Sequence, residues 1–549
     1  MKKWLSFMLA LVLAGTMLVG CGEEKELSSE ELNYEFSFEK PKEPTINWDN
    51  MNSDDEDSDE TEENSQGDSS QEDSNTVKTV ESRDLVTGVN KLQDENLRYV
   101  MIYNPGVYDE EDILHNVSLS TGELGVQVAV DDNRASEEEE EVESLTMSQG
   151  DMNDGIPMDE FDLSGSKAGG VSAAYQVGDT KTFYCYDQVS TDNPRISAYF
   201  TCRYVGSYCN IWTAGSEMDD VAIEMYGKEF DQNVYTKVVK TFGEPRYADQ
   251  GGKVNLLYYA MPENLAGCFC LLDLYATGEV TEKQIQTYGV NTDMAIMHIN
   301  ANYAVIPEME MVMKATMAHE FQHLICGTNY FYTMDYRYCQ TWLNEAMSGY
   351  IEERVYPGAK QAGTHLDEFY DSFLVSHGWS LYNFMTTPTD IGVYGSVYLY
   401  SEYLANLAGE DVFSNVHDYW RNSYSTTLDE AEALYNAVPK EIQQGIDQSI
   451  AYPNELIFED DEEEWMSKLT LNFYIELLQY DEGEPEVFKQ GDVRRLLYDE
   501  INAAALEGGG RIIVELKEDT FEIPMDADKG LIYVGFDENF EVTTDFVYR

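Results

Sequence analysis

Two histidines and a glutamate stand close together in the stretch TMAHEFQHLICG, which runs from Thr316 to Gly327. If this stretch is helical, His319 and His323 lie on one face, because residues four apart are neighbours on a helix. Two imidazoles placed in this way can bind one metal ion. Glu320 would project from the adjoining side of the same turn, near enough to accept a proton from water at the metal. The His-Glu-x-x-His spacing therefore predicts a metal centre with a general base beside it.

The chain has only 7 histidines among its 549 residues. A chance match to this spacing is expected on the order of once in a hundred such chains. The alternative interpretation is a pair of neutral histidines packed in a core with hydrogen-bonded partners. A catalytic zinc ion usually has three protein ligands and one open position. A third histidine at the metzincin spacing is excluded, because Cys326 and Asn329 stand where that motif needs glycine and histidine.

Glu345 is the favoured third ligand. It lies 22 residues beyond His323 in WLNEAMSGYIEE, a segment expected to form a second helix that could pack against the first. With 104 acidic residues in the chain, this distance alone identifies nothing. The string NEAMS, however, resembles the third-ligand signature of the gluzincin peptidases. Asp335, Glu352 and Glu353 are the competing candidates for this ligand.

The chain resembles the hyicolysin-type branch of the gluzincins, which are secreted bacterial neutral zinc metallopeptidases of the thermolysin-like clan. The similarity covers roughly residues 180 to 407 and runs through FYCYD, CNIW, KVNLLYYAM, HEFQHLI, WLNEAMSGYIEE and YGSVYLYSEYL. The resemblance implies a gluzincin catalytic domain with one catalytic Zn²⁺ between two helices, and hydrolysis of polypeptide substrates in the extracellular space. Whether calcium is bound as well stays open.

In the mechanism that follows, zinc held by His319, His323 and Glu345 activates water, and Glu320 takes the proton and passes it to the leaving amine. No acidic motif for binding a substrate N-terminus precedes the histidines, so an endopeptidase is preferred over an aminopeptidase. The alternative function is a non-catalytic surface lipoprotein of the binding or adhesion kind, with a degenerate peptidase-like domain. The intact general base favours the enzyme.

A tyrosine is the expected donor for the oxyanion of the reaction. Tyr394 is the candidate, because it stands in VYGSVYLYSEYL, just before a third expected helix, in a place resembling a Tyr-plus-glycine segment of related gluzincins. Tyr350 and Tyr398 are alternatives. A plain packing role is open for all three, since the chain has 39 tyrosines.

One position departs from the thermolysin-like enzymes, in which an acid one turn after the third ligand hydrogen-bonds to a zinc-bound histidine. This chain has Gly349 at that place. Carboxylates in this outer position fix the tautomer and orientation of the ring, and their loss can weaken metal affinity about tenfold or more. Glu352 or Ser348 could substitute.

The fold class expected is α+β: a gluzincin-like catalytic domain with a mixed sheet and active-site helices, a β-rich domain before it and a small module after it. Alternating apolar residues predict strands in the β-rich domain, at 85–218. The catalytic domain, at 219–453, opens on a helix stopped by Gly243 and Pro245. Its metal-binding helix should end in a left-handed cap at Gly327. The helical and β module follows at 454–549.

Substrate binding in this clan uses an edge strand beside the active-site helix. The segment HINANYAV, which precedes the metal-binding helix, is either that strand or an ordinary interior strand. His298 within it is most simply a core or edge histidine with its hydrogen bonds satisfied.

The first twenty residues, MKKWLSFMLALVLAGTMLVG, have the pattern of a signal peptide. Leu18, Val19 and Gly20 precede Cys21, which resembles the lipobox of bacterial lipoproteins, where that cysteine is lipidated. The alternative is an ordinary signal peptide with a chance cysteine. Residues 21–84 are acidic and poor in apolar side chains, which predicts a disordered tether. The protein would be anchored at the extracytoplasmic face of a bacterial cell membrane, through its lipid alone.

The formal net charge is −70. Nucleic acid and anionic membrane surfaces are therefore poor partners, because both repel a strongly acidic protein. Apart from Cys21, seven cysteines remain, and an odd number cannot all pair. They are interpreted as structural or free thiols.

Overall fold

A computed structural model describes the chain from residue 80 onward, with gaps. The predicted signal peptide, Cys21 and most of the predicted tether lie outside the described residues. The described residues are 80, 82–106, 115–122, 125–131, 174–186, 195–215, 218–245, 252–262, 265–274, 281–292, 294–331, 341–359, 380–382, 390–422, 429–454, 456, 458, 460–478, 504–506, 508–516, 519–523 and 530–549. They form both helices and sheets, which is compatible with the predicted α+β class.

A mixed six-stranded sheet packs against the helix that contains His319 and His323. Its strand order is β10-β11-β9-β8-β7-β6, so β10 forms one edge. β8 and β9 pair in parallel, as do β9 and β11, whereas the other neighbours are antiparallel. The strands are β6 (Thr180–Tyr186), β7 (Arg195–Val205), β8 (Cys209–Ala214), β9 (Val254–Tyr259), β10 (Gly267–Phe269) and β11 (Ile296–Asn300).

The central strands β9 and β11 are buried at every residue, as expected of strands covered on both faces. Met297 and Ile299 of β11 face one hydrophobic core, whereas Ile296 packs into a second core on the other face. The sheet takes strands from both sides of the boundary expected at residues 218 and 219. The β-rich sequence before that boundary and the strands after it therefore share one sheet.

The helix predicted after Asp219 is confirmed, in three pieces: α2 (Asp220–Glu229), a π-helical turn η3 (Phe230–Val234) and α3 (Tyr235–Phe242). The side chain of Asp219 accepts a hydrogen bond from the backbone N–H of Ala222 and so caps the start. Gly243 ends α3 with φ at 83°, a left-handed conformation that suits glycine.

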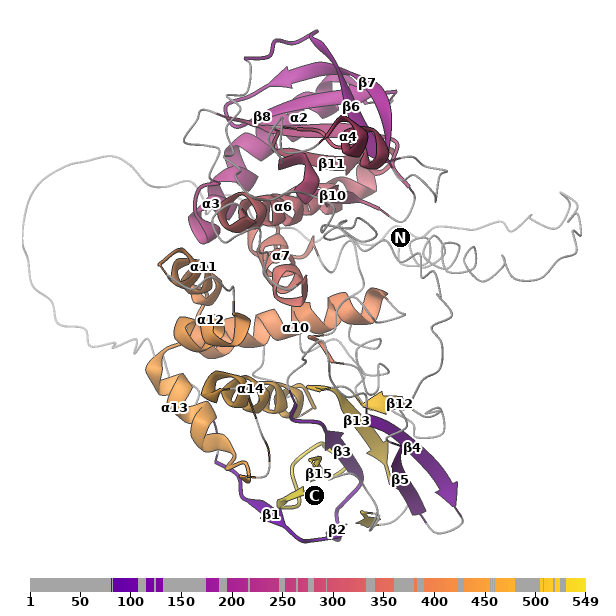
Figure 1. Cartoon of the computed structure of the whole chain (residues 1–549), viewed down its shortest axis with the longest axis vertical. Coiled ribbons are helices and arrows are strands. Elements are labelled where there is room, and N and C mark those ends of the chain that lie inside the picture. Colours follow the sequence, from indigo (N-terminus) through magenta and orange to yellow (C-terminus); the bar gives the residue numbers. More distant parts are fainter. Residues whose placement is uncertain are drawn as a thin grey trace, which may run out of the picture. The chain divides into compact units, whose positions relative to one another are not determined.

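Three long helices follow: α6 (Glu310–Cys326), α7 (Thr341–Val355) and α10 (Asp390–Ala408). Helix α6 packs against β10, β11 and α7, and α7 packs against α10 as well (Figure 1). All residues from Met317 to Cys326 are buried, so this half of α6 is enclosed on every side. The polar side chains inside that stretch therefore need partners within the protein.

The predicted left-handed cap at Gly327 is wrong. Gly327 has φ at −57°, in the right-handed region, and the chain continues into a π-helical turn η7 (Gly327–Phe331). Glycine is needed for space instead, because a Cβ there would lie 2.9 Å from the ring of Phe269 and 3.0 Å from Leu271.

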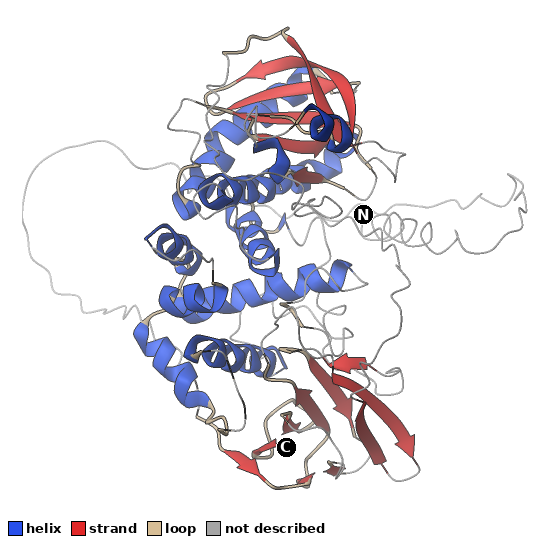
Figure 2. Cartoon of the chain, in the orientation of Figure 1, coloured by secondary structure: helices blue, strands red, loops and turns tan. Residues whose placement is uncertain are grey.

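Helices α11 (Val412–Asn422), α12 (Glu430–Ala437), α13 (Lys440–Ser449) and α14 (Asp461–Leu478) follow α10. A five-stranded sheet of order β1-β16-β15-β3-β13 combines the two ends of the described chain, which are indigo and yellow in Figure 1; Figure 2 draws the strands in red. Its strands are β1 (Leu85–Thr87), β3 (Tyr99–Tyr103), β13 (Arg511–Glu515), β15 (Ile532–Phe536) and β16 (Phe546–Tyr548). The strands predicted for a separate C-terminal module thus pair with strands that precede residue 219, where the catalytic domain is expected to begin.

Two smaller sheets repeat this exchange between the ends of the chain. β12 (Ala504–Leu506) pairs with β4 (His115–Gly122), which also pairs with β5 (Gly125–Asp131). β14 (Thr520–Glu522) pairs with β2 (Lys91–Gln93).

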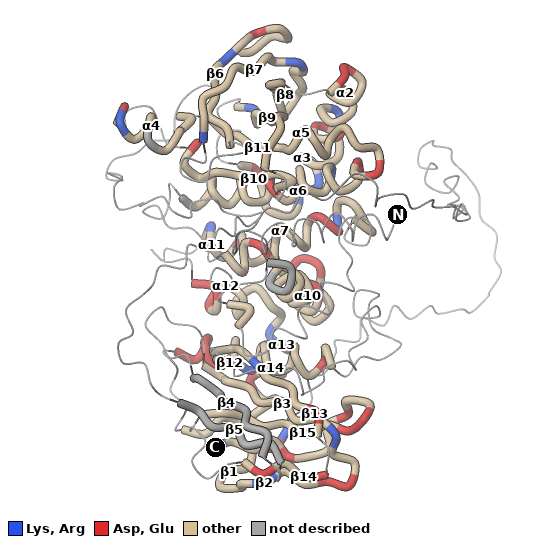
Figure 3. The backbone as a smooth tube through the Cα atoms, turned by 90° about the vertical axis from the view of Figure 1, so that its right-hand side faces the viewer, with Lys and Arg blue, Asp and Glu red and all other residues tan. Residues whose placement is uncertain are grey.

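Acidic positions recur along the described backbone, with basic ones more sparse among them (Figure 3). Among the described residues, none of the helices has the length and apolar character that crossing a membrane requires.

Candidate metal centre

His319 and His323 lie one turn apart in the buried half of α6. Their side chains are 4% and 1% exposed, and their ring centroids are 4.6 Å apart with the planes at 85°. Glu310 and Met311 at the start of α6 are exposed, so the histidines sit deeper in the protein than the helix start. Helical spacing therefore brings both rings to one point on the face that meets α7.

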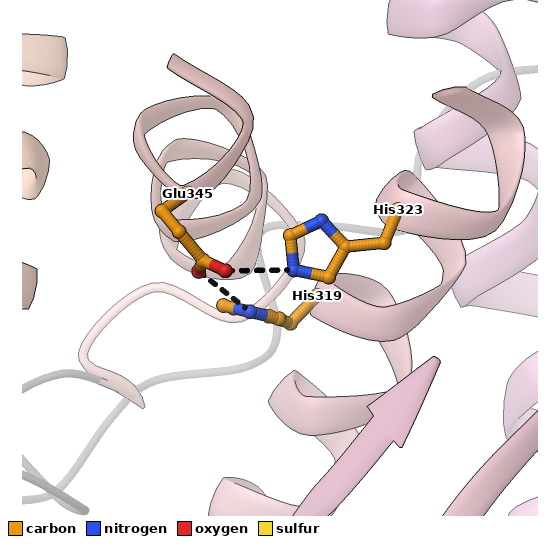
Figure 4. A group of neighbouring side chains, drawn as sticks. All are labelled: His319, His323 and Glu345. Atoms are coloured by element: carbon orange, nitrogen blue, oxygen red, sulfur yellow. Dashed lines mark ion pairs between the residues drawn. The ribbon is translucent and has the colours of Figure 1, made fainter. Parts of the chain in front are cut away.

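Glu345 reaches the same point from α7. Its Oε2 lies 3.2 Å from His319 Nε2, and its Oε1 lies 3.4 Å from His323 Nε2. Figure 4 shows the carboxylate facing both rings. One ligand atom from each of the three residues can be chosen so that all lie within 4.8 Å of one another. All three residues are buried, and this is the group of His, Cys, Asp and Glu in the described part of the chain that could hold an ion.

The spacing of these atoms fits a tetrahedral divalent ion. Two ligand atoms that each stand about 2.0–2.1 Å from such an ion are about 3.3 Å apart. The observed separations of 3.2 Å and 3.4 Å match that edge length. The donor set of two imidazoles and one carboxylate is also the one found in catalytic zinc sites, so the residues fit zinc.

The electrostatics of the three residues are those of a strongly coupled buried group. Burial favours the neutral carboxyl, but His323 and His319 hold the pKa of Glu345 well below its usual range. Burial would lower the pKa of His319, yet its contacts with Glu345 and Glu352 raise that pKa to about 10. Glu345 raises the pKa of His323 as well. Without a metal, positive charge on the rings compensates the buried carboxylate.

Glu320 is buried beside this group, with a side chain only 1% exposed. Burial is the main cause that raises its pKa to about 7, while His319 and His323 act in the opposite direction. Its Oε2 has no hydrogen-bond partner among the described residues. A carboxylate with a pKa near neutrality and an open acceptor atom is suited to general-base chemistry.

Glu352 contacts the ring nitrogen of His319 that does not face Glu345. Its Oε1 lies 2.5 Å from Nδ1 of the ring. Ser348 does not take this position, because its hydroxyl donates to the backbone oxygen of Glu345 at 2.9 Å. Glu353 accepts a hydrogen bond from the backbone N–H of Gly358. Among the competing candidates for the third ligand, Glu352 therefore contacts Nδ1 of His319, whereas Glu345 faces Nε2. Asp335 lies outside the described residues.

The three candidate tyrosines are placed differently. Tyr394 lies inside α10 and not before it, because this helix begins earlier than expected. Its ring is partly buried against the main core. The hydroxyl of Tyr350 donates to the backbone oxygen of Glu410 at 2.9 Å, and Tyr398 is buried. The role of Tyr394 at the oxyanion stays a prediction.

The interpretation of HINANYAV as an edge strand is wrong. β11 lies between β10 and β9, and the segment turns into the short helix α5 (Ala301–Ala304). The edge beside α6 is β10. A Cβ added at Gly267 of β10 would lie 2.7 Å from Thr316 and 3.3 Å from Cγ of Glu320, so this strand runs directly along the active-site helix. The sequence does not indicate which strand forms the edge, because the apolar pattern of a strand does not specify its neighbours.

His298 is a core histidine with satisfied hydrogen bonds, as expected. Its Nε2 lies 3.1 Å from Oδ2 of Asp273, and its Nδ1 lies 3.0 Å from the hydroxyl of Tyr259. Arg195 also donates to Oδ2 of Asp273, at 2.8 Å. Asp273 follows β10 directly in the 3₁₀ turn η5 (Leu271–Leu274), so this buried network fixes the end of the edge strand.

Comparison with known proteins is consistent with a metal-dependent peptidase. No family model matches the sequence. The chain is similar to the neutral metalloprotease ShpI of Staphylococcus hyicus, with 25% identity over 279 residues. The matched region makes up 49% of this chain and 59% of ShpI, so the chain spans about three fifths of that protein. The similarity to a neutral metalloprotease supports a metallopeptidase, and so a protease and hydrolase.

Proposed function

We propose that this protein is a lipid-anchored extracellular zinc metalloendopeptidase. The observation that carries the proposal is the convergence of His319, His323 and Glu345 from two packed helices, at separations that fit a tetrahedral ion. Glu320 adds an ionisable carboxylate beside them, and similarity to a neutral metalloprotease supports the same reaction class. Its substrates would be polypeptides.

His319, His323 and Glu345 would hold the zinc ion. When bound there, zinc would polarise the scissile carbonyl and make water a stronger acid. Glu320 is placed to take the proton from the attacking water and to return it to the leaving amine. Its buried position keeps competing solvent away from the carboxylate. Tyr394 is the proposed donor to the oxyanion.

The edge strand β10 is the proposed site for the substrate backbone. It pairs with β11 on one side, and no described strand pairs with its other side. An extended peptide can therefore add to the sheet by main-chain hydrogen bonds, as in strand addition. Because β10 runs along α6, a peptide bound in this way would cross the face of the protein near Glu320.

Anchoring through Cys21 follows from the lipobox-like sequence LVGC after an apolar signal segment. A single lipid-modified residue would tether the protein at the extracytoplasmic face of the cell membrane without spanning it. Replacement of Cys21 with alanine should release the protein into the medium. Retention of Cys21→Ala on the cells would contradict the anchor.

The first prediction concerns the general base. Glu320→Gln keeps the shape of the side chain but cannot accept a proton, so hydrolysis should fall by about 10²–10⁴-fold with zinc retained. Casein hydrolysis and zinc content would be measured for the native protein, for Glu320→Gln and for the exposed control Glu308→Gln. The control should behave as the native protein. Zinc bound without hydrolysis in the native protein and in Glu320→Gln would contradict the enzyme and favour a binding protein.

A further inference from the structure

Helix α7 presents two carboxylates to a single imidazole. Glu345 and Glu352 are seven residues apart, which is close to two helical turns, so they share one face of α7. Glu345 Oε2 lies 3.2 Å from Nε2 of His319, and Glu352 Oε1 lies 2.5 Å from Nδ1 of the same ring. Both nitrogens of His319 therefore face acids of one helix.

The two contacts cannot have the same chemistry once a metal is bound. A metal takes the lone pair of a neutral imidazole, so one ring nitrogen must carry the hydrogen and the other must be bare. An ionised carboxylate only accepts hydrogen bonds. Nδ1 of His319 must then donate to Glu352, which leaves the lone pair on Nε2, the nitrogen that faces Glu345 and His323.

We propose that Glu352 is the positioning residue of the metal centre, and that it fixes His319 in the tautomer and ring orientation that zinc needs. This inference rests on the proposed function, because it assigns zinc to the three residues. Two positions of α7 that are closer to Glu345 in sequence do not take this role. Gly349 has no side chain to reach the ring, and the hydroxyl of Ser348 is turned back to its own helix.

The turn of α7 that carries Glu352 is itself held in place. Arg354 forms an ion pair with Glu402 of α10, with Nη2 and Oε2 3.0 Å apart. Its guanidinium carbon also lies 4.5 Å from the ring centroid of Tyr350. Glu402 is only 5% exposed and Arg354 is half-buried, so this pair is a partly buried link between α7 and α10. A carboxylate that orients a metal ligand must sit on a rigid support, and this link supplies one.

The test compares zinc affinity in five proteins: native, Glu352→Ala, Glu352→Gln, Glu352→Asp and the matched control Glu353→Gln on the same helix. Zinc dissociation constants would be measured by competition with a chromophoric chelator. We expect Glu352→Ala to weaken zinc binding about 10- to 100-fold, the usual effect of losing such a partner. Glu352→Gln keeps a neutral acceptor and should be intermediate, Glu352→Asp should recover part of the affinity, and Glu353→Gln should match the native protein.

A second readout separates positioning from general stability. The visible absorption of the Co²⁺-substituted protein reports the geometry of the ligands, and ¹⁵N shifts of His319 report its tautomer. Both should change in Glu352→Gln at a temperature where its circular dichroism matches the native protein, although the metal-free variant should melt lower because His319 loses a charged partner. If Glu352→Ala does not fold, Glu352→Gln decides. Native affinity and a native cobalt spectrum in Glu352→Gln would overturn the proposal.

Failure of the proposed function would be recognised separately. Native protein that binds zinc without hydrolysing casein refutes the peptidase but leaves the comparison of affinities intact. If His323→Ala binds zinc as tightly as the native protein, the metal centre itself is misassigned, and the role of Glu352 falls with it.

Discussion

At the scale of single residues, the buried half of α6 contains charge that a purely structural helix would not carry. His319, Glu320 and His323 are each less than 5% exposed, among neighbours that are mostly apolar. Burying ionisable groups without partners is costly. Glu345 and Glu352 compensate His319, Glu345 compensates His323, and the two histidines in turn favour the ionised form of Glu320. Such a cluster is retained in proteins chiefly where it binds or reacts.

Zinc binding should release protons. The contacts with Glu345 and Glu352 raise the pKa of His319 to about 10, so the metal-free protein keeps a proton on that ring at neutral pH. Zinc needs the neutral ring, and its affinity should therefore rise as pH increases and the proton is more easily lost, by about tenfold per pH unit for one proton. Calorimetry in two buffers of different ionisation enthalpy would count the protons. Affinity independent of pH between about 6 and 8 would contradict the coupling.

Sequence spacing alone identified the two histidines and Glu320, because one helical turn relates them. Glu345 needed the string around it, since distance along the chain does not choose among many acids. Contact between Glu352 and His319 depends on how two helices cross, which no local spacing encodes. From the sequence, Glu352 is therefore one of several candidates for the third ligand. The packing of α7 on α6 places Glu345 next to both histidines and Glu352 next to Nδ1 of His319.

At the scale of elements, β10 and α6 are separated by a glycine. A Cβ at Gly267 would lie 2.7 Å from Thr316 Cγ2 and 3.0 Å from the backbone oxygen of His298. The first is in α6 and the second is in β11, so a side chain would push the edge strand away from the helix or away from its own sheet. Glu320 lies within the same contact, with Cγ at 3.3 Å.

Gly267→Ala should therefore lower peptide hydrolysis more than zinc content. The displaced strand would change the proposed path of the substrate past Glu320, whereas the proposed zinc ligands lie on α6 and α7. A 1 Å displacement can cost about 10²-fold in rate. The control is Gly445→Ala in α13, where the added Cβ would have ordinary contacts of 3.6 Å with Val80. Native hydrolysis in Gly267→Ala would show that this strand does not line the substrate path.

Long periodic elements were predictable and short ones were not. The helices around His319 and Glu345 have clear boundaries in sequence, and α7 spans Thr341–Val355 much as its pattern indicated. The short apolar stretch of β10 indicates neither its length nor its place at the sheet edge, and the apolar pattern of β11 extends into residues that form α5. Gly327 was interpreted as a cap because the sequence shows a glycine at a helix end but not the ring of Phe269 that crowds it.

At the scale of the whole molecule, strands from the two ends of the described chain pair in one sheet. β3, from the N-terminal side, lies between β15 and β13 from the C-terminal side. Tyr103 of β3 donates a hydrogen bond to the backbone oxygen of Ser467 in α14 at 2.9 Å. Local sequence does not predict which distant strands pair, because the apolar pattern of one strand does not specify its partner strand. The sequence therefore predicted strands at both ends, but not the single sheet they make.

Deletion of residues 504–549 should destabilise the part of the fold that remains. It would remove both partners of β3 and the partner of β1, and would leave the buried residues Met101 and Ile102 uncovered. We expect an insoluble chain or a clearly lower melting temperature by circular dichroism. Deletion of residues 22–76, whose acidic composition predicts a tether, is the control and should leave the melting temperature unchanged. A truncated protein that melts like the full chain would show that the C-terminal strands are an independent module.

The most direct test of the metal centre is anomalous X-ray diffraction from crystals of the zinc-loaded protein, with data collected on both sides of the zinc absorption edge. The account predicts one anomalous peak about 2.0–2.2 Å from His319 Nε2, His323 Nε2 and a carboxylate oxygen of Glu345. A peak elsewhere in the molecule, or a Glu345 carboxylate that does not contact the ion, would contradict it.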